Sequence, residues 1–324
     1  MIIEIKGLEK KFGDFAALKG ISLSIKEREI FGILGPNGAG KTTTINLLLG
    51  LLKPTKGSII IEGMDTSKEL NKIKQTIGFM TQETVVDADL TAYENLEIAG
   101  RLYQMYGKRL EDAIWNALKE ANLENFAFEK AGTFSGGMQR RLLLVKSMIH
   151  NPHILVLDEP TTGLDIQSRF SMWKHIKELN ERGVTIILTT QYLEEADQLC
   201  NRIAIIDHGQ IKAIGTPSQL KKSIAEQNML ELIVDASSVN KALKALEKIG
   251  LKANASGENI KAPIEGKDEM KRVIAELEKE KIEIISISMH LPTLDDVFIK
   301  LTGESMRDKV GEMKSNRSMA FRRR

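Results

Sequence analysis

A glycine-rich segment that ends in lysine and threonine is the first group of residues that could do chemistry. Residues 35–42 read Gly-Pro-Asn-Gly-Ala-Gly-Lys-Thr and follow the apolar run 29–34. Glycines let backbone N–H groups surround an anion at the positive end of the helix predicted over 42–49. Lys41 can then reach the β- and γ-phosphates of a nucleotide, and the Thr42 hydroxyl can ligate Mg²⁺. The pattern predicts a site for a nucleoside triphosphate.

Two adjacent carboxylates form the second candidate group. Residues 154–160 read Ile-Leu-Val-Leu-Asp-Glu-Pro, so four apolar residues predict a buried strand that ends at Asp158 and Glu159. In open α/β sheets the carboxyl ends of the strands form the edge where ligands bind. Asp158 is expected to help hold Mg²⁺. Glu159 is expected to polarise an attacking water, because phosphoryl transfer needs a positioned nucleophile more than a covalent partner.

A serine–glycine triplet is the third candidate group. Ser135, Gly136 and Gly137 open a predicted helix, where they offer a hydroxyl and unobstructed backbone N–H groups to a phosphate. Alone, such a triplet is more often a flexible loop. Here it stands 17 residues before Pro152, directly ahead of the acidic strand, and this position favours a role in the same site.

Composition excludes several classes of function. The 324 residues are 42% hydrophobic and 28% charged with a net charge of +2, which describes an ordinary globular protein and gives no global electrostatic case for binding nucleic acid. Neither a signal-peptide pattern nor an apolar stretch near the ~20 residues of a membrane span is present. The single cysteine, Cys200, excludes an internal disulfide and fits a reducing cytosol.

Apolar spacing predicts the elements that must position these groups. Helical periodicity dominates from about 90 to 121, and continuous apolar strands then alternate with helices, as in a parallel sheet. Composition shifts near 218–228, and a small α+β set follows, whose last helix starts with Thr293 and Asp296 at capping-box spacing. The predicted strands are 2–5, 21–25, 30–34, 58–62, 76–81, 154–157, 185–188, 203–206, 210–215, 229–234 and 282–287, with weaker ones in 251–263; further helices are predicted at 239–249 and 267–280.

The order of the motifs resembles that of the ATP-binding cassette (ABC) family over nearly all of residues 1–220. Family membership implies an α/β P-loop NTPase cassette fold with a mixed sheet and a helical subdomain at about 85–150. Beyond it we expect the small α+β domain over 221–303 and a basic, mostly disordered tail at 304–324. The motifs that match are the phosphate loop at 35–43, Gln82 after its strand, the signature at 134–138, Asp158 with Glu159, and 163–165, which matches the segment that crosses to a partner subunit.

The resemblance also assigns the nucleotide contacts. Two cassettes of the family pair head to tail, so that ATP on one phosphate loop meets Ser135 and Gly137 of the other copy. Binding of two ATP closes the pair and hydrolysis lets it reopen; a homodimer is expected. Phe12 stands where the family stacks adenine on an aromatic ring, without the usual phenol. The implied ATP contacts are Phe12, Gly35, Pro36, Asn37, Gly38, Ala39, Gly40, Lys41, Thr42, Thr43, Ser135, Gly136, Gly137 and Asp165.

One residue departs from the family pattern. The resemblance assigns Mg²⁺ to Thr42, Gln82 and Asp158, and catalysis to Glu159, Gln82 and the residue at position 191. That residue is generally a histidine that contacts the γ-phosphate and orients Glu159, but this chain has Gln191. Glutamine can donate a hydrogen bond to the γ-phosphate but cannot become cationic. We therefore expect intact ATP binding and turnover slower than is usual for the family.

Two segments are similar to the subgroup that exports drugs and antibiotics. These are 160–165, together with Met138 in the signature, and the tail motif at 292–303. In that subgroup the ATPase docks onto a separate membrane-embedded permease from the inner, cytoplasmic face of the membrane. By analogy, the groove near Gln82 and the helical region from Val85 to Tyr106 would receive a cytoplasmic helix of the permease.

Other nucleotide-binding classes fit less well. A soluble cassette protein of translation would carry two phosphate loops in one chain. A chromosome-maintenance ATPase would need a long coiled coil where only about 90 residues intervene without sustained heptads. A P-loop kinase would lack the Ser-Gly-Gly signature. A nucleotide-gated regulatory module with little turnover stays open as an alternative, because Gln191 replaces the usual histidine.

Overall fold

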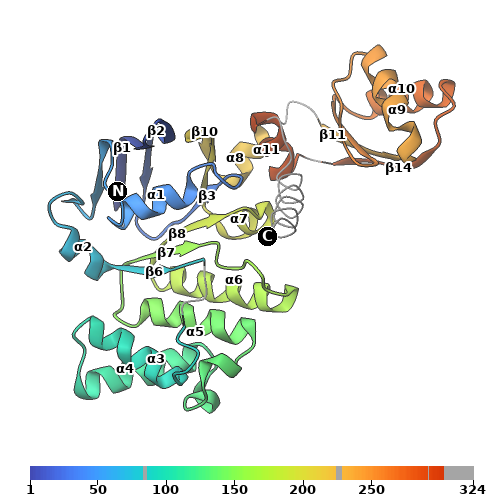
Figure 1. Cartoon of the computed structure of the whole chain (residues 1–324). Coiled ribbons are helices and arrows are strands. Elements are labelled where there is room, and N and C mark those ends of the chain that lie inside the picture. The colour runs from blue at the N-terminus through green and yellow to red at the C-terminus, as the bar shows by residue number, and fades with distance from the viewer. Residues whose placement is uncertain (83–85, 224–227, 291, 303–324) are drawn as a thin grey trace, which may run out of the picture. The chain divides into compact units, whose positions relative to one another are not determined.

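The computed structural model describes residues 1–82, 86–223, 228–290 and 292–302. The chain divides into two compact units, Met1–Thr216 and Pro217–Arg324 (Figure 1). This division lies four residues before the boundary expected after residue 220, because the short helix α8 (Pro217–Lys222) packs with α11 (Leu294–Thr302) in the second unit. The expected tail at 304–324 and Val85 lie outside the described residues.

A six-stranded sheet forms the centre of the first unit. Its strand order is β10-β9-β3-β8-β7-β6, with β10 antiparallel to β9 and every other pair parallel. The mixed sheet confirms the expected fold class. Strands β3, β7 and β8 are buried along their whole length, which explains why their sequences are continuous apolar runs. The strands are β3 (Ile30–Leu34), β6 (Ile77–Met80), β7 (Ile154–Asp158), β8 (Thr185–Thr190), β9 (Arg202–Asp207) and β10 (Gln210–Gly215).

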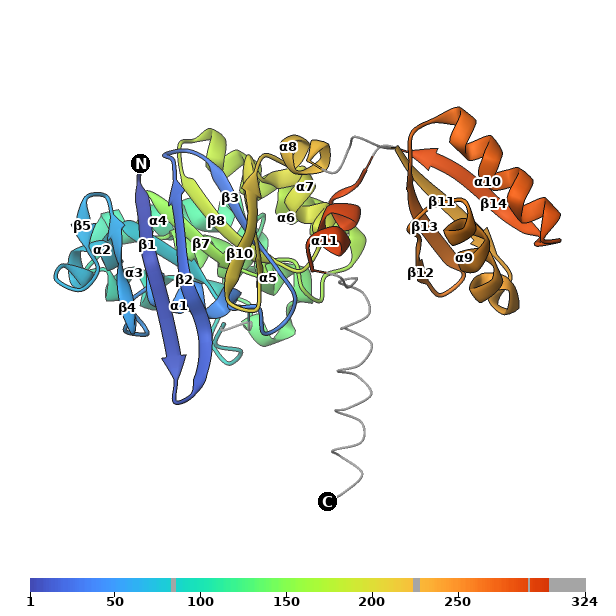
Figure 2. The same cartoon turned by 90° about the horizontal axis from the view of Figure 1, so that it is seen from above.

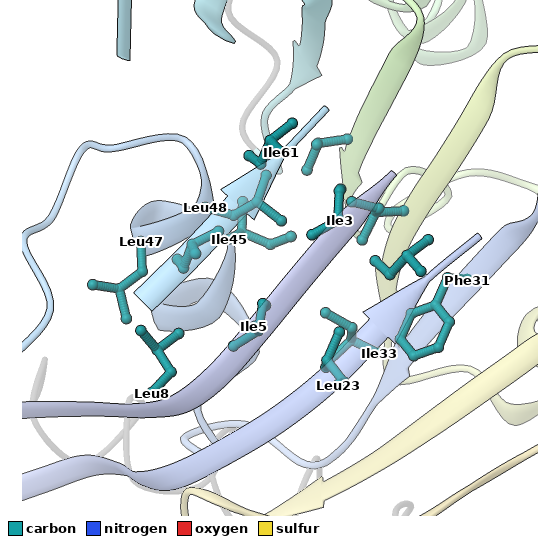
Figure 3. Packing of buried hydrophobic residues seen from close by; sticks show 14 of the residues in the cluster. Ile3, Ile5, Leu8, Leu23, Phe31, Ile33, Ile45, Leu47, Leu48 and Ile61 are labelled. Atoms are coloured by element: carbon teal, nitrogen blue, oxygen red, sulfur yellow. The ribbon is translucent and has the colours of Figure 1, made fainter. Parts of the chain in front are cut away.

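A second, antiparallel sheet packs with helix α1 (Lys41–Leu48) around the main core of this unit. Apolar side chains of β1, β2 and β4 converge with those of β3 and α1 (Figure 3). Strands β1 and β2 are longer than the predicted 2–5 and 21–25. Their remaining parts contain register shifts and only a few buried residues, Leu8, Ala17 and Leu18, among exposed or half-buried ones, so the apolar pattern that marks a strand is interrupted there. The strands of this sheet are β2 (Phe15–Ile25), β1 (Ile3–Phe12), β4 (Lys56–Ile61) and β5 (Met64–Asp65). Helix α2 (Leu70–Thr76), which we did not predict, follows this sheet in the sequence and leads into β6.

The helical subdomain has its own core. Helices α3 (Ala92–Leu102), α4 (Gly107–Glu120) and α5 (Gly136–Met148) pack on one another through buried residues that run from Ala92 to Ile149. Figure 1 shows α5 lying between the central sheet and the other two helices. Thr91 and Glu94 form a capping box that begins α3. Two more helices, α6 (Ile166–Glu181) and α7 (Leu193–Leu199), complete the first unit.

The second unit holds an antiparallel sheet of order β12-β13-β11-β14. Helices α9 and α10 cover one face of it (Figure 2), and their apolar side chains share one core with β11 and β13. The predicted capping box of α11 is confirmed, because Asp296 accepts from the Thr293 N–H at 2.8 Å and Thr293 accepts from the Asp296 N–H at 3.3 Å. The elements are β11 (Asn228–Val234), α9 (Val239–Lys248), β12 (Asn254–Ser256), β13 (Asn259–Ile264), α10 (Lys267–Lys279) and β14 (Ile284–His290). Within the described parts of both units, no helix has the length and hydropathy that a membrane crossing requires.

A half-buried histidine joins the helical subdomain to the central sheet. His150, which follows α5, stacks on Tyr103 at the end of α3 with ring centroids 3.5 Å apart and planes within 3°. Its Nε2–H donates to the carbonyl of Ile77 at 3.2 Å, and a carbonyl can only accept, so this contact fixes the tautomer. Nδ1 is buried and has no hydrogen-bond partner within the described residues. Burial lowers the pKa of His150 to about 4.

Replacing His150 is therefore expected to change how stability depends on pH. In the unfolded chain a histidine binds a proton below about pH 6.5, so the stability contributed by neutral His150 is present above that pH and is lost as pH falls toward 4. With allowance for partial exposure, the wild type should lose about 1–2 kcal/mol more than His150→Phe between about pH 7.5 and about pH 4.5. Urea denaturation at the two pH values measures this. His208→Asn, in the exposed turn between β9 and β10, should behave as the wild type. If the wild type and His150→Phe lost equal free energies of unfolding between the two pH values, the conclusion that folding lowers the pKa of His150 would be wrong.

Candidate functional site

Three strands of the central sheet end side by side and deliver the chemical motifs to one edge. Leu34 at the end of β3 pairs with Thr190 at the end of β8, and Asp158 at the end of β7 pairs with Thr189. On the far side of β7, β6 pairs through Met80 and Leu157, and Gln82 follows it two residues later. The parallel register thus brings together residues that are up to 156 positions apart in sequence, as Leu34 and Thr190 are.

The phosphate loop surrounds a buried ammonium group. Lys41 is only 5% exposed, and its Nζ donates to the carbonyl oxygens of Gly35 at 2.8 Å and Pro36 at 3.3 Å. Its Nζ also lies 3.6 Å from Glu159 Oε1. Burial lowers the pKa of Lys41, and the nearby carboxylates of Glu159 and Asp158 oppose that effect. An anion that enters the loop can replace these partners.

Backbone geometry explains the glycines of the loop. A Cβ on Gly35 would lie 2.3 Å from the carbonyl oxygen of Ile206, so only glycine fits this close approach of two backbones. Gly40 has a φ of 109°, which side-chain-bearing residues rarely adopt, and it precedes α1 without a side-chain cap. The first N–H groups of α1 therefore remain available to a phosphate.

Glu159 is held from several directions in a strained conformation. Its φ of 49° lies in the left-handed region, which costs a non-glycine residue about 1–3 kcal/mol and is found most often at functional sites. Its N–H donates to the carbonyl oxygen of Thr189 at 3.1 Å, and its carboxylate accepts from Gln82 Nε2 at 3.1 Å and from Thr162 Oγ1 at 3.2 Å. Together with Lys41, these contacts aim the carboxylate at the mouth of the phosphate loop.

Thr189 was not singled out from the sequence, yet it contacts both carboxylate residues. Its hydroxyl donates to Asp158 Oδ1 and accepts from the Glu159 N–H at 3.2 Å, and the side chain is fully buried. The only signal for it in the sequence is a hydroxyl near the end of an apolar strand. That signal becomes meaningful only when the pairing of β7 with β8 is known.

The helix that begins with the Ser-Gly-Gly triplet is linked to the same edge. Ser135 caps α5 by accepting from the Met138 N–H at 3.3 Å, and Ser135 and Gly136 are exposed. One turn into α5, the buried side chain of Arg140 donates to the carbonyl oxygens of Thr81 at 3.2 Å and Glu159 at 3.3 Å. Arg140, which sequence reasoning missed, connects the signature helix to Glu159 and to the segment that leads to Gln82.

Asp165 caps α6 beside the signature. It accepts from the Ser168 N–H at 2.9 Å and from the Ser168 hydroxyl at 2.7 Å, and these hydrogen bonds lower its pKa. A Cβ on Gly137 would lie 2.7 Å from Ser168 Oγ, so α5 and α6 approach closely at this point. Ser135 and Asp165 thus stand on the exposed surface of adjoining helix starts.

Only part of the expected site is assembled within one chain. One network of contacts links Gly35, Pro36, Lys41, Gln82 and Glu159. Asp158 joins this network through Thr189. Phe12 is 47% exposed at the end of β1, with Lys10 Nζ 4.9 Å from its ring centroid. Within the described residues, no hydrogen bond connects this network to the other expected site residues, which are Phe12, Ser135, Gly136, Gly137, Asp165 and Gln191. In the phosphate loop and the start of α1, Ala39 is buried and Thr43 is half-buried, whereas Asn37, Gly38 and Thr42 are exposed.

Comparison with known proteins accounts for nearly the whole chain. The ABC transporter family profile matches residues 18–162, and the profile of the C-terminal domain of DrrA1-3-like ATP-binding proteins matches residues 215–302. The daunorubicin resistance ATP-binding protein DrrA3 of Streptomyces coeruleorubidus is 37% identical over 308 residues, which cover 95% of this chain and 98% of that protein. The chain belongs to the ABC transporter family.

Other members with similar sequences extend this picture. Nod factor export ATP-binding protein I of Burkholderia lata is 37% identical to this cassette over 94% of the chain and 98% of that protein. Among solved structures, a dimeric post-hydrolysis state of the ATP-binding cassette MJ0796 bound to ADP and Pi superimposes with a TM-score of 0.60 at 33% identity, covering 66% of this chain and 98% of that one. This ABC protein is an ATP-binding ATPase.

The residues of this ABC cassette also suit magnesium. The expected ligands Thr42, Gln82 and Asp158 all offer oxygen, the donor that Mg²⁺ prefers. Gln82 donates through its nitrogen to Glu159, so its amide oxygen remains for a metal. Within the described residues no group of three His, Cys, Asp or Glu side chains could hold a metal by itself.

Proposed function

We propose that this protein is the ATP-hydrolysing subunit of a membrane exporter, and that closure of a head-to-tail dimer by Mg-ATP drives a separate permease. The observation that carries the proposal is the network at the mouth of the phosphate loop, in which buried Lys41 and buried Glu159 pair and exposed Gln82 donates to Glu159. The names of the drug-resistance and Nod-factor-export relatives support an export role. We place the protein in the cytoplasm, on the inner face of the cell membrane.

Hydrolysis follows from the network when a triphosphate enters. Lys41 exchanges the carbonyls and Glu159 for the β- and γ-phosphates, which leaves the Glu159 carboxylate to accept a hydrogen bond from water. That water attacks the γ-phosphorus, the bond to the bridging β–γ oxygen breaks, and ADP and phosphate leave, with the water proton taken up at Glu159. Bound Mg²⁺, held by Thr42, Gln82 and Asp158, supplies positive charge that neutralises the phosphates.

A second copy would complete the site. Ser135, Gly136 and Asp165 are exposed, and none of them contacts the phosphate loop of its own chain through a hydrogen bond in the described residues. The exposed start of α5 carries a hydroxyl and N–H groups of the kind that bind phosphate. The similar cassette MJ0796 is dimeric with ADP and Pi bound, which supports the same pairing here.

Glu159→Gln should separate binding from hydrolysis. The variant keeps the shape of the side chain but loses the base, so ATP binding should persist while the ATPase rate falls at least about 100-fold. The trapped ATP complex should then be a dimer, measured by size exclusion with light scattering. Adding Ser135→Glu to this variant should return it to a monomer that still binds ATP, because a carboxylate at this position repels the γ-phosphate. A monomer for Glu159→Gln at saturating Mg-ATP, with the permease present, would refute the dimer.

The identity of residue 191 should limit the rate of turnover. Gln191 directly follows β8 and can donate to the γ-phosphate only as a neutral group. Gln191→His should therefore raise the ATPase rate several-fold without a large change in ATP affinity, whereas Gln191→Ala should lower it. Steady-state ATPase assays check both variants. An unchanged rate in Gln191→His would contradict the prediction. The resistance and export relatives give no support to the alternative of a regulatory module with little turnover.

A small apolar cavity is the proposed place of permease docking. It has a volume of 170 Å³ and lies where α3 ends beside β6, the strand that leads to Gln82. Leu51 at its rim is 59% exposed and Tyr103 is 38% exposed. We propose that a cytoplasmic helix of the permease inserts an apolar side chain here, close to the segment that carries Gln82. The lining residues are Leu49, Leu51, Ile73, Lys74, Ile77, Phe79 and Tyr103.

Leu51→Asp tests this docking site. A charged group in the cavity would have to be desolvated by the incoming helix, so the variant should fail to co-purify with the permease that the wild type binds. Its ATPase activity in isolation should stay within twofold of the wild type. Phe15→Asp is the matched control, because Phe15 is 64% exposed on β2, in the antiparallel sheet. Retention of the complex by Leu51→Asp would exclude this cavity.

A further inference from the structure

A buried carboxylate outside the nucleotide network connects three segments of the first unit. Glu195 on α7 has no exposed surface, and its Oε1 accepts from the Thr161 hydroxyl at 2.8 Å and from the Trp173 indole N–H at 3.0 Å. Neither the family motifs nor the proposed mechanism uses this residue. Isolated buried carboxylates are costly unless hydrogen bonds compensate them, so the position calls for an explanation.

The three partners lie on segments that frame the reacting groups. Thr161 follows Glu159 by two residues and is itself buried. Trp173 lies on α6, the helix that Asp165 caps. Glu195 follows Gln191 by four residues, in the helix that begins directly after the turn at the end of β8.

The same turn is held by two more contacts. The Tyr192 N–H donates to Thr190 Oγ1 at 2.9 Å, and the guanidinium of Arg169 on α6 lies 5.1 Å from the centroid of the Tyr192 ring. Burial raises the pKa of Glu195, while the hydrogen bonds from Thr161 and Trp173 to Oε1 and the charge of Arg169 oppose that effect; Oε2 is buried and has no hydrogen-bond partner within the described residues. Two residues after Gln191 are therefore fixed: Tyr192 contacts α6, and Glu195 contacts both α6 and the segment after Glu159.

We propose that Glu195 is a positioning residue for ATP hydrolysis, which holds the Gln191 turn at a fixed place relative to Glu159. Strands β7 and β8 pair through Asp158 and Thr189, and the Glu159 N–H still donates to the Thr189 carbonyl. Beyond that point the strands diverge, and the bond between Thr161 and Glu195 continues the connection where the sheet has ended. Two residues from different strands can then face one γ-phosphate with a constant separation.

The proposal separates the binding of ATP from its hydrolysis. Lys41 and the loop glycines are held by β3 and α1 and by contacts within the loop, so they do not depend on Glu195. Loss of Glu195 should let the Gln191 turn shift, and a shift of about 1 Å can cost up to about 100-fold in rate. The expected signature is a lower kcat with a nearly unchanged KM for ATP. The inference rests on the proposed function, from which it takes that the chain hydrolyses ATP and that Gln191 faces the γ-phosphate.

Substitution of Thr161 gives the sharpest test, because it removes one hydroxyl without changing the volume of the side chain. In the full-length protein, Thr161→Val should lower kcat about 10-fold and leave KM within twofold, since misplacement affects the transition state and not the phosphate cradle. Thr161→Ser, which keeps the hydroxyl, should have a kcat close to that of the wild type. Glu195→Ala should lower kcat at least as far, and the double variant Thr161→Val with Glu195→Ala should be no worse than Glu195→Ala alone, because the two residues act through one bond.

A matched control distinguishes positioning from general loss of stability. Thr185 is buried in β8 at the opposite end from the site, and its hydroxyl accepts from the Arg28 N–H at 2.9 Å. Thr185→Val should reduce thermal stability about as much as Thr161→Val but leave kcat at the wild-type value. A wild-type kcat in Thr161→Val, a change confined to KM, or an equal fall in kcat in Thr185→Val would overturn the proposal. A wild type without ATPase activity would instead refute the proposed function, so the two failures are distinguishable.

Discussion

The buried ammonium of Lys41 is the constraint on which the rest of the site depends. A charge that is 5% exposed must be compensated, and here two loop carbonyls and the carboxylate of Glu159 provide the compensation. These partners come from the ends of two different strands, β3 and β7, so the ion pair also fixes the distance between the phosphate loop and the reacting carboxylate. A triphosphate brings more negative charge than Glu159 does. The buried ammonium of Lys41 needs negative partners, and this same need gives the loop its affinity for phosphate.

The architecture around Lys41 serves to keep strand ends in register. Parallel strands that are buried on both faces have no exposed side to slip toward, and the helices that flank them fill the remaining space. This rigidity lets the backbone of Glu159 stay in a left-handed conformation that an isolated turn would not hold. Arg140 then extends the same control to the helical subdomain, because one guanidinium contacts the backbone before Gln82 and at Glu159.

Much of this could be predicted from the sequence, because the relevant signals are local. Strands β3 and β10 were predicted to the residue, since short continuous apolar runs and the turn at Asp207 mark them clearly. The outer halves of β1 and β2 were missed, because their few core residues, such as Leu8 and Leu18, are separated by exposed residues and register shifts. Thr189, Arg140 and Glu195 could not be recognised for a different reason. Their partners are 19 to 59 residues away in sequence, so their meaning exists only after the sheet has formed.

In the proposed mechanism, the neutral residue at position 191 makes geometry more important than charge. A histidine at that position could contribute a positive charge to the transition state, whereas Gln191 can contribute only a directed hydrogen bond. The strength of a directed hydrogen bond depends steeply on distance and angle, whereas a charge acts over a longer range. A chain that relies on such a bond needs its turn held more firmly, and in our proposal α7 supplies that hold through the fully buried Glu195, which accepts hydrogen bonds from two donors on other segments.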